Sequence, residues 1–156
     1  MQLSLKSLAE KIETIEKKLD KISVLLPEPV KPSRFTDNND GTITDKETNL
    51  TWMKEDNSKR MKWEEAKKYC ESNEAKLPGE GWRLPTVKEL ISIVDYDRHS
   101  PCIDPLFLGT QSAYYWSSTP YANDSVGAWC VSFYDGGVYW NDVDGGGLVR
   151  PVRQNS

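Results

Sequence analysis

The sequence has no aromatic residue in its first 34 positions, although the 156-residue chain holds six Trp, seven Tyr and three Phe. That segment carries seven basic and five acidic residues, whereas the remaining 122 residues carry thirteen basic and nineteen acidic ones. A charged segment without aromatics has too little apolar material to bury a core, while the aromatic remainder has enough for one domain. We therefore expect an appendage, residues 1–34, joined to a single compact domain.

Long apolar runs and clustered cations are also missing. No apolar run approaches the roughly 18–20 residues of a membrane span, and the first residues lack the apolar core and cleavage site of a signal peptide. We therefore expect no membrane span and no signal peptide, and the compartment stays open. Between His99 and Val149 there is no Lys or Arg but there are five Asp. A phosphate-binding surface needs clustered cations, so nucleic acid is not an expected partner.

Residue types that carry catalysis or bind metals are sparse. The chain holds one histidine, His99, and three cysteines, Cys70, Cys102 and Cys130. It has no HExxH, no paired CxxC and no glycine-rich loop followed by Lys and Ser or Thr. His99 is expected in a surface loop with nothing to order it. We therefore expect no catalytic residue, no metal ion and no cofactor, while one disulfide stays open, with Cys70–Cys102 the favoured pair.

The appendage carries an apolar heptad. Leu or Ile recurs at alternating spacings of three and four, at Leu5, Leu8, Ile12, Ile15, Leu19, Ile22 and Leu26. This period predicts a coiled-coil helix over residues 1–26. Mostly Leu at a and Ile at d favours trimers or tetramers, and Lys11 at g can pair with Glu16 at the next e position of a parallel chain. We expect a homo-oligomer, with a trimer favoured; the alternative is a lone amphipathic helix packed on the domain.

A stiff, extended linker is predicted between the helix and the domain. Pro27, Pro29 and Pro32 fall within residues 27–34, and proline both interrupts a helix and favours extended backbone. The domain is therefore expected to occupy residues 35–156.

The domain begins with a predicted hairpin, Phe35–Met53, whose turn lies at residues 38–41. A calcium-binding loop is the competing interpretation, because polar residues from Thr36 to Glu47 fall at EF-hand offsets. The first of these positions, Thr36, supplies no carboxylate, and no helix flanks the segment, so the turn is favoured.

Two helices and a strand are predicted in the middle of the domain. Residues 62–70 place apolar side chains on one helical face. Thr86 then has the character of an N-cap, with Glu89 completing a capping box for a helix that runs through Val94. A strand is expected over residues 114–119.

The last forty residues alternate in a strand-like pattern. One phase, which includes Trp129, Val131, Phe133 and Trp140, is apolar and is expected to face the core. The other phase and the loop that follows it mix Tyr, Ser, Gly, Asn and Asp, a composition typical of adaptable recognition surfaces. A closing strand is expected over residues 148–153. The candidate ligand-binding residues are Cys130, Ser132, Tyr134, Asp135, Gly137, Tyr139, Asn141, Asp142, Val143, Asp144, Gly145, Gly146 and Gly147.

Several motifs in this order resemble the Lcl C-terminal domain family. They include Leu50-Thr-Trp52, Trp82-Arg-Leu-Pro85, Tyr115-Trp-Ser-Ser118 and Val149-Arg-Pro-Val-Arg153. The resemblance covers nearly all of residues 35–153. It implies an α+β fold of the C-type-lectin-like kind, with two helices beside small irregular antiparallel sheets, and a non-enzymatic domain that binds carbohydrate or protein ligands. Many members carry a Cys at the position of Pro151, so a bridge from there to Cys70 is not expected here.

The C-terminal motif further resembles the variable region of proteins that diversity-generating retroelements diversify. In those systems, adenine mutagenesis at Asn codons reaches all of the residue types found at the candidate positions, but it does not reach Trp. The resemblance implies a variable region over about residues 123–148, in which Trp140 is fixed.

The function that these observations favour is ligand recognition by a diversified surface on a coiled-coil oligomer, with an unknown protein or carbohydrate as partner. A carbohydrate-binding adhesin without diversification is the alternative. Two further interpretations stay open: an enzyme of the formylglycine-generating kind, for which Cys130 is the one candidate cysteine, and a purely structural trimer.

Overall fold

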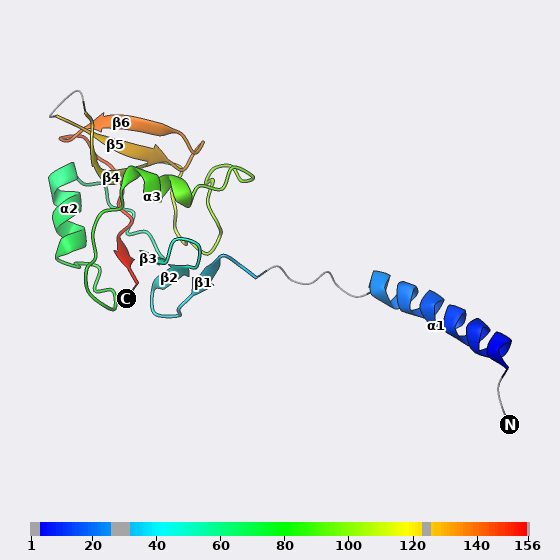
Figure 1. The fold of residues 1–156 in the computed structure, drawn as a ribbon. Helices are drawn as coiled ribbons and strands as arrows, with labels where there is room; N and C mark the ends of the chain where they lie inside the picture. The colour runs from blue at the N-terminus through cyan, green and yellow to red at the C-terminus, as the bar shows by residue number, and fades with distance from the viewer. Residues whose placement is uncertain (1–3, 26–31, 123–125, 156) are drawn as a thin grey trace. The chain divides into compact units, whose positions relative to one another are not determined.

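The computed structural model describes residues 4–25, 32–122 and 126–155, in two units divided between Ser33 and Arg34 (Figure 1). Leu26, residues 27–31 of the predicted linker and residues 123–125 of the predicted variable region lie outside the described residues. The elements, in chain order, are α1 (Leu5–Leu25), β1 (Phe35–Asp37), β2 (Thr42–Asp45), β3 (Leu50–Met53), α2 (Trp63–Glu71), α3 (Val87–Ser92), β4 (Tyr114–Pro120), β5 (Gly127–Ser132), β6 (Val138–Asp142) and β7 (Val152–Gln154).

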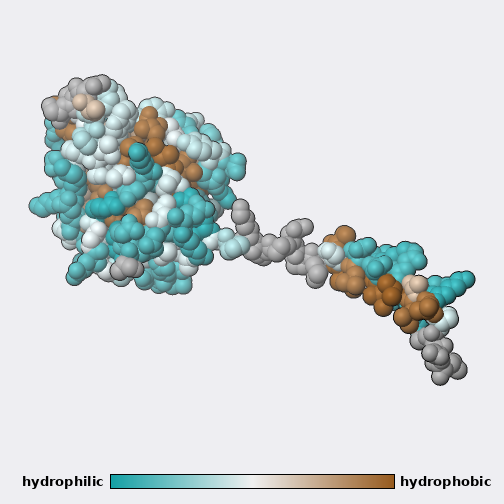
Figure 2. Space-filling view, viewed as in Figure 1, coloured by the Kyte–Doolittle hydropathy of each residue, from teal (hydrophilic) through white to brown (hydrophobic). Residues whose placement is uncertain are grey.

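Helix α1 confirms the helix that the heptad predicts. Ser4 begins it, because the Ser4 hydroxyl accepts the Ser7 N–H at 3.2 Å. Its Leu and Ile side chains from Leu5 to Ile22 form one stripe along the helix (Figure 2) and are exposed, Ile15 by 56%. Polar residues occupy the other side, where Lys17 pairs with Glu13 at 2.7 Å. The association of this stripe with other copies stays a prediction. None of the described helices is long and apolar enough to cross a membrane.

The first sheet has the order β1-β2-β3-β7 and is antiparallel throughout. The predicted hairpin is confirmed and gains a strand, because β1 pairs with β2 across the turn. In that turn the Asp40 carboxylate accepts hydrogen bonds from the Thr42 N–H and hydroxyl, and Asp37 pairs with Lys54. The carboxylates of Asp37 and Asp40 are therefore engaged in contacts within the hairpin. No group of metal-ligating side chains occurs among the described residues.

The second sheet has the order β4-β5-β6 and is also antiparallel. Trp116, Cys130 and Tyr139 lie side by side across its three strands. The predicted closing strand is shorter than expected, since β7 begins at Val152 and belongs to the first sheet. Leu148 instead forms a parallel bridge with Tyr115.

The two domain helices lie beside the second sheet (Figure 1) and pack on its opposite faces. On one face Val131 and Phe133 pack with Leu90 and Ile93 at α3. On the other face the residues of β4 and β5 pack with α2, and this cluster is Met61, Ala66, Cys70, Leu84, Trp116, Ala128, Cys130 and Val149. The core therefore covers β5 from both sides.

Helix α3 has the capping box that the sequence predicts. The Thr86 hydroxyl accepts the Glu89 N–H at 3.2 Å, and the Glu89 carboxylate accepts the Thr86 N–H at 2.7 Å. The predicted end at Val94 is wrong, because the helix stops at Ser92. Val94 instead forms an antiparallel bridge with Ile103, which draws it out of the helix.

Arg150 is fully buried at the join between the two sheets. Its guanidinium donates to the carbonyls of Met53 and Lys54 at 2.8 and 2.9 Å, and to the Thr110 hydroxyl at 2.7 Å. Its charge lies over the rings of Phe107 and Tyr115, and burial lowers the pKa of this guanidinium. One side chain thus hydrogen-bonds two other chain segments, residues 53–54 and Thr110.

We expect Arg150→Ala to lower the free energy of unfolding by about 3–5 kcal/mol, because it leaves a cavity and unpartnered buried carbonyls. Urea unfolding of the purified chain measures this. The control is Arg98→Ala, which removes an exposed pair with Asp95 and should change the same quantity by less than about 1 kcal/mol. Equal effects of the two substitutions would contradict the role given to Arg150.

Candidate functional site

The candidate residues lie on the hairpin of β5 and β6 and on the loop that follows it. Paired residues of antiparallel strands share a face of the sheet. Tyr139, opposite Cys130, therefore lies on the face that α2 covers, and Trp140, opposite Trp129, lies on the α3 face. Neither helix reaches β6, so both of its faces carry exposed side chains.

Cys130 and Ser132 do not point outward as predicted, since their exposed fractions are 1% and 5%. The prediction assumed a strand with one wet face, whereas β5 is central and helices cover both of its sides. The Cys130 thiol donates to the Tyr139 carbonyl at 3.4 Å, and the Ser132 hydroxyl accepts the Tyr134 N–H at 3.2 Å. These two side chains support the surface from below.

Trp140 is 52% exposed, so the prediction that it lies in the core is wrong. Its ring stacks on Tyr121 at a centroid distance of 5.2 Å, and Tyr121 meets the Trp129 ring edge-on at 5.1 Å. Val138 on the same face is also exposed. Trp140 and Val138 are exposed because β6 is an edge strand that α3 does not cover.

Tyr139, Asp135 and Tyr114 form the ordered centre of the candidate surface. The Tyr139 hydroxyl donates to Asp135 at 2.8 Å, and the Tyr139 ring meets Tyr114 edge-on at 5.3 Å. Asp135 also accepts the Gly137 N–H at 3.0 Å. That hydrogen bond, together with the one from Tyr139, holds the pKa of Asp135 below its usual range, while Asp135 raises the pKa of the Tyr139 hydroxyl. The sequence did not mark Tyr114, although it pairs with Ser132 in the sheet.

Tyr134 lies at the end of the hairpin and is exposed. Its ring meets His99 edge-on at a centroid distance of 5.2 Å. His99 is exposed in a loop, as predicted. Its ring contact comes from a residue distant in the sequence, because the long loop before β4 returns to the hairpin. The Tyr96 hydroxyl, from the same loop, donates to the Gly136 carbonyl at 3.3 Å.

The loop over residues 142–147 is anchored to the segment before α2. Met61 and Gly147 exchange two backbone hydrogen bonds of 3.0 Å, and the Trp63 N–H donates to the Val143 carbonyl at 3.0 Å. Lys62 pairs with Asp144 at 2.9 Å, and the hydrogen bond and charge of that carboxylate raise the pKa of Lys62. The glycine-rich sequence suggests a flexible loop, but hydrogen bonds and an ion pair hold it at residues 143, 144 and 147.

Two cations reach this surface that the sequence did not associate with it. Arg60 donates to the Gly146 carbonyl at 3.2 Å, and Lys62 lies beside Asp144. The prediction of a surface without basic residues is wrong at this end. The local sequence does not predict either contact, because more than eighty residues separate the partners in each.

The structure divides the predicted ligand-binding residues by accessibility. Those that are exposed are Tyr134, Asp135, Tyr139, Asp142, Asp144 and Gly146. Those that are half-buried are Gly137, Asn141, Val143 and Gly145. Gly147 is buried beside Cys130 and Ser132 in the support of the surface, and a Cβ at this position would lie 2.6 Å from Trp116 Nε1.

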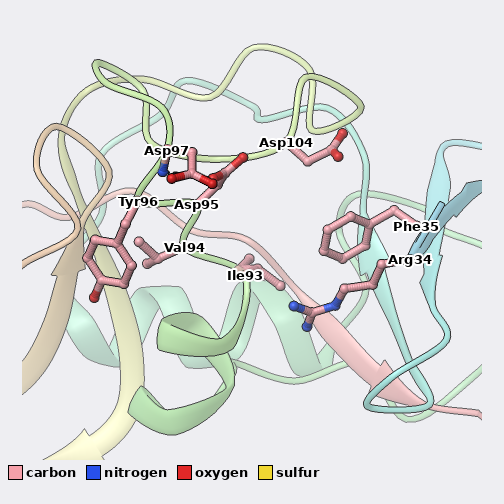
Figure 3. A pocket seen from close by; sticks show the side chains of 8 residues that line it. All are labelled: Arg34, Phe35, Ile93, Val94, Asp95, Tyr96, Asp97 and Asp104. Carbon is pink, nitrogen blue, oxygen red and sulfur yellow. Dashed lines mark hydrogen bonds between the residues drawn. The ribbon is translucent and has the colours of Figure 1, made fainter. Parts of the chain in front are cut away.

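A separate hollow of about 360 Å³ lies between the start of β1 and the loop after α3 (Figure 3). Asp95, Asp97 and Asp104 line one side of it, and Arg34 and Phe35 line the other. Two of its charged side chains, Arg34 and Asp95, already have partners within the fold. Arg34 donates to Asp45 and to the Ser92 carbonyl, and Asp95 accepts the Asp97 N–H and pairs with Arg98. We therefore place the candidate site on the hairpin.

All three cysteines are free and buried, so the favoured Cys70–Cys102 disulfide is not formed. Burial raises the pKa of the Cys130 thiol to about 11 and also raises the pKa of Cys70 and Cys102. Near neutral pH each side chain is thus held as a thiol, which is a poor nucleophile.

Gly147→Ala and Gly146→Ala test which loop positions accept a side chain. At 147 the methyl group would displace the Trp116 indole, which donates to the Met61 carbonyl at 2.8 Å. We expect this substitution to lower the free energy of unfolding by about 1–3 kcal/mol. At 146 the new atom meets only the side chain of Arg60, and we expect a change below about 1 kcal/mol. Thermal unfolding of both variants measures the difference, and equal stability would contradict the support role of Gly147.

Comparison with known proteins identifies the domain. No curated protein matches the chain. The family model described as the Lcl C-terminal domain matches residues 41–153, which include both sheets from β2 onward and the whole hairpin. Because this match spans most of the sequence, the chain belongs to the Lcl C-terminal domain family.

Proposed function

We propose that this domain recognises a ligand through the surface of β6 and its flanking loops, without catalysing a reaction. We further propose that its two helices and two small sheets form a C-type-lectin-like fold. The observation that carries the proposal is that polar and aromatic side chains are exposed on this surface, while Cys130, Ser132 and Gly147 beneath them are buried. Exposed Tyr134 and Tyr139 are rigid aromatic anchors, and Asp135, Asn141 and Asp144 beside them offer hydrogen bonds. The buried residues beneath hold the backbone still.

The absence of catalysis is part of this proposal. The buried thiols with raised pKa values do not favour covalent chemistry at Cys130. His99 packs on a tyrosine rather than on a nucleophile. Asp144 is engaged by Lys62, which leaves no free carboxylate pair with Asp142 for acid–base work.

Display on an oligomer follows from α1. The exposed Leu and Ile stripe is the narrow seam of a coiled coil, and its a and d residues favour three chains. Lys11 at g faces Glu16 at e of the next chain only when the helices are parallel. Three parallel copies carry three recognition surfaces, which raises the apparent affinity for a multivalent ligand without any new contact.

Diversification of the surface is the finer part of the proposal. The exposed candidate residues are of types that adenine mutagenesis reaches, whereas the exposed Trp140 is not. The support residues Gly147 and Trp116 constrain each other sterically. Diversification requires a near-copy of the 3′ coding end, beside a reverse transcriptase, that differs at adenines. Without such a copy the domain is an ordinary adhesin-like module.

Carbohydrate binding is the second candidate, and the cluster of Tyr121, Trp129 and Trp140 favours it. Exposed aromatic faces stack on sugar rings, and this cluster lies on the face of β6 opposite Tyr139. The two candidates therefore predict different sensitive residues on one short strand.

We expect the full chain to bind members of an array of purified cell-surface proteins, and Tyr139→Ala to weaken that binding about tenfold or more, because it removes an anchor. Trp140→Ala should matter less. The matched control is Leu108→Ala, an exposed apolar residue outside the hairpin. The same chains are applied to a glycan array with and without calcium. Glycan binding that Trp140→Ala abolishes and Tyr139→Ala spares would support the second candidate, and no binding on either array would contradict both.

We expect sedimentation of the full chain to give the mass of three copies, and Ile15→Asp to give the mass of one, because a buried carboxylate in the seam is too costly to desolvate. Thr14→Asp is the matched control, since it adds the same charge at the neighbouring position on the polar face of α1. A single-chain mass for the unaltered protein would contradict display on an oligomer.

A further inference from the structure

Strand β6 is an open edge of its sheet. Among the described residues, the order of the second sheet ends with β6, and β6 pairs with β5 alone. The Ser132 N–H donates to the Gly137 carbonyl at 2.9 Å, and residues of an antiparallel strand turn toward and away from the partner strand in alternation. Gly137, Tyr139 and Asn141 therefore direct their backbone groups to β5. The N–H and C=O groups of Val138 and Trp140 face the other way.

The large side chains of β6 do not cover this edge. A Cβ at Gly127, on the neighbouring strand, would lie 3.3 Å from the Trp140 ring, so that ring folds back over β5. The Tyr139 ring folds back over the opposite face, where it meets Gly137 and Tyr114 of β4. Both rings flank the edge and leave its backbone groups open.

The usual devices that block an edge strand are missing from β6. Natural edges carry lysine, proline or a bulge, which prevent pairing with another chain. β6 has the sequence Val-Tyr-Trp-Asn-Asp, and its register with β5 is continuous over five residue pairs. Val138, at the start of β6, is 41% exposed, and Trp140 is 52% exposed. A further strand thus finds both free backbone groups and apolar contacts.

Charge around the edge selects the kind of strand that fits. Asp142 ends β6, and Asp135 lies in the turn before it, both exposed. No Lys or Arg occurs between His99 and Val149. The two cations that reach the loop after β6 are engaged there, because Arg60 donates to the Gly146 carbonyl and Lys62 pairs with Asp144. A strand with basic side chains meets complementary charge at both ends of the edge, while an acidic one meets repulsion.

We propose that β6 binds an extended, basic segment of a protein ligand by strand addition, with the ligand main chain bonded to Val138 and Trp140. The flanking rings then contact side chains on alternate sides of the added strand. This inference rests on the proposed recognition function and names its partner class. Main-chain bonding supplies affinity that does not depend on the diversified side chains, which then determine which basic segment is preferred.

The probe is an acetylated and amidated Lys-Val-Lys-Val-Lys-Val peptide, added to the full chain at millimolar concentration. Hydrogen exchange measured by NMR follows the amides of Val138 and Trp140. We expect the peptide to slow exchange at both amides, and no slowing would overturn the proposal. Two peptides separate the contributions: one N-methylated at alternate residues, which keeps the charge but cannot pair, and one with Asp in place of Lys. Neither should protect the edge, and protection by the N-methylated peptide would indicate charge attraction alone and overturn strand addition.

Variants of the protein supply the second test. Val138→Lys places a cation on the edge and should weaken peptide binding about tenfold or more. Leu108→Lys adds the same charge at an exposed site away from the sheet and should have little effect, so equal weakening by both would count against the edge. If the Ile15→Asp chain forms dimers through β6, the occupant is a second copy and the inference is wrong. Binding on the protein array without edge protection refutes the inference and leaves the proposed function standing.

Discussion

The burial of β5 on both faces is the constraint on which the rest of the domain depends. Helix α3 closes one face and α2 the other, so β5 and β4 are fixed in the core. The same packing leaves β6 as an edge that neither helix reaches. A strand in this position has a fixed backbone but side chains that contribute little to the core. The fold therefore separates the residues that hold the structure from those that meet solvent, and it does so within a single hairpin.

The loop after β6 is held in place by the segment that precedes α2. Its backbone is bonded to Met61 and Trp63, which lead directly into α2. The helix that covers one face of β5 therefore also positions the loop beside β6. Arg150, in the segment after this loop, adds a second link to the core. Its guanidinium donates to the carbonyls of Met53 and Lys54. The candidate surface is thus held at both ends by the same core.

Local chemistry was predictable from the sequence, and position within a sheet was not. The capping box of Thr86 and Glu89, the helix of α1 and the turn at Asp40 come from short-range patterns, and each is confirmed. Alternation along β5 correctly indicated a strand, but it gave the wrong orientation for Cys130. The period is the same for a central and an edge strand, and only the long-range arrangement of α2 and α3 decides which faces are dry. The membership in the Lcl C-terminal domain family was recognisable because its motifs are themselves core residues.

Side chains on the candidate surface are not independent of one another. Gly137 lacks a side chain where a Cβ would lie 2.6 Å from the Tyr139 ring, and that ring position allows the hydrogen bond to Asp135. A larger residue at 137 moves the tyrosine and frees the aspartate. Sequence change at such paired positions alters the shape of the surface in correlated steps, whereas the backbone edge of β6 stays constant. Under the proposed function, this arrangement combines a constant backbone edge with side chains that change together.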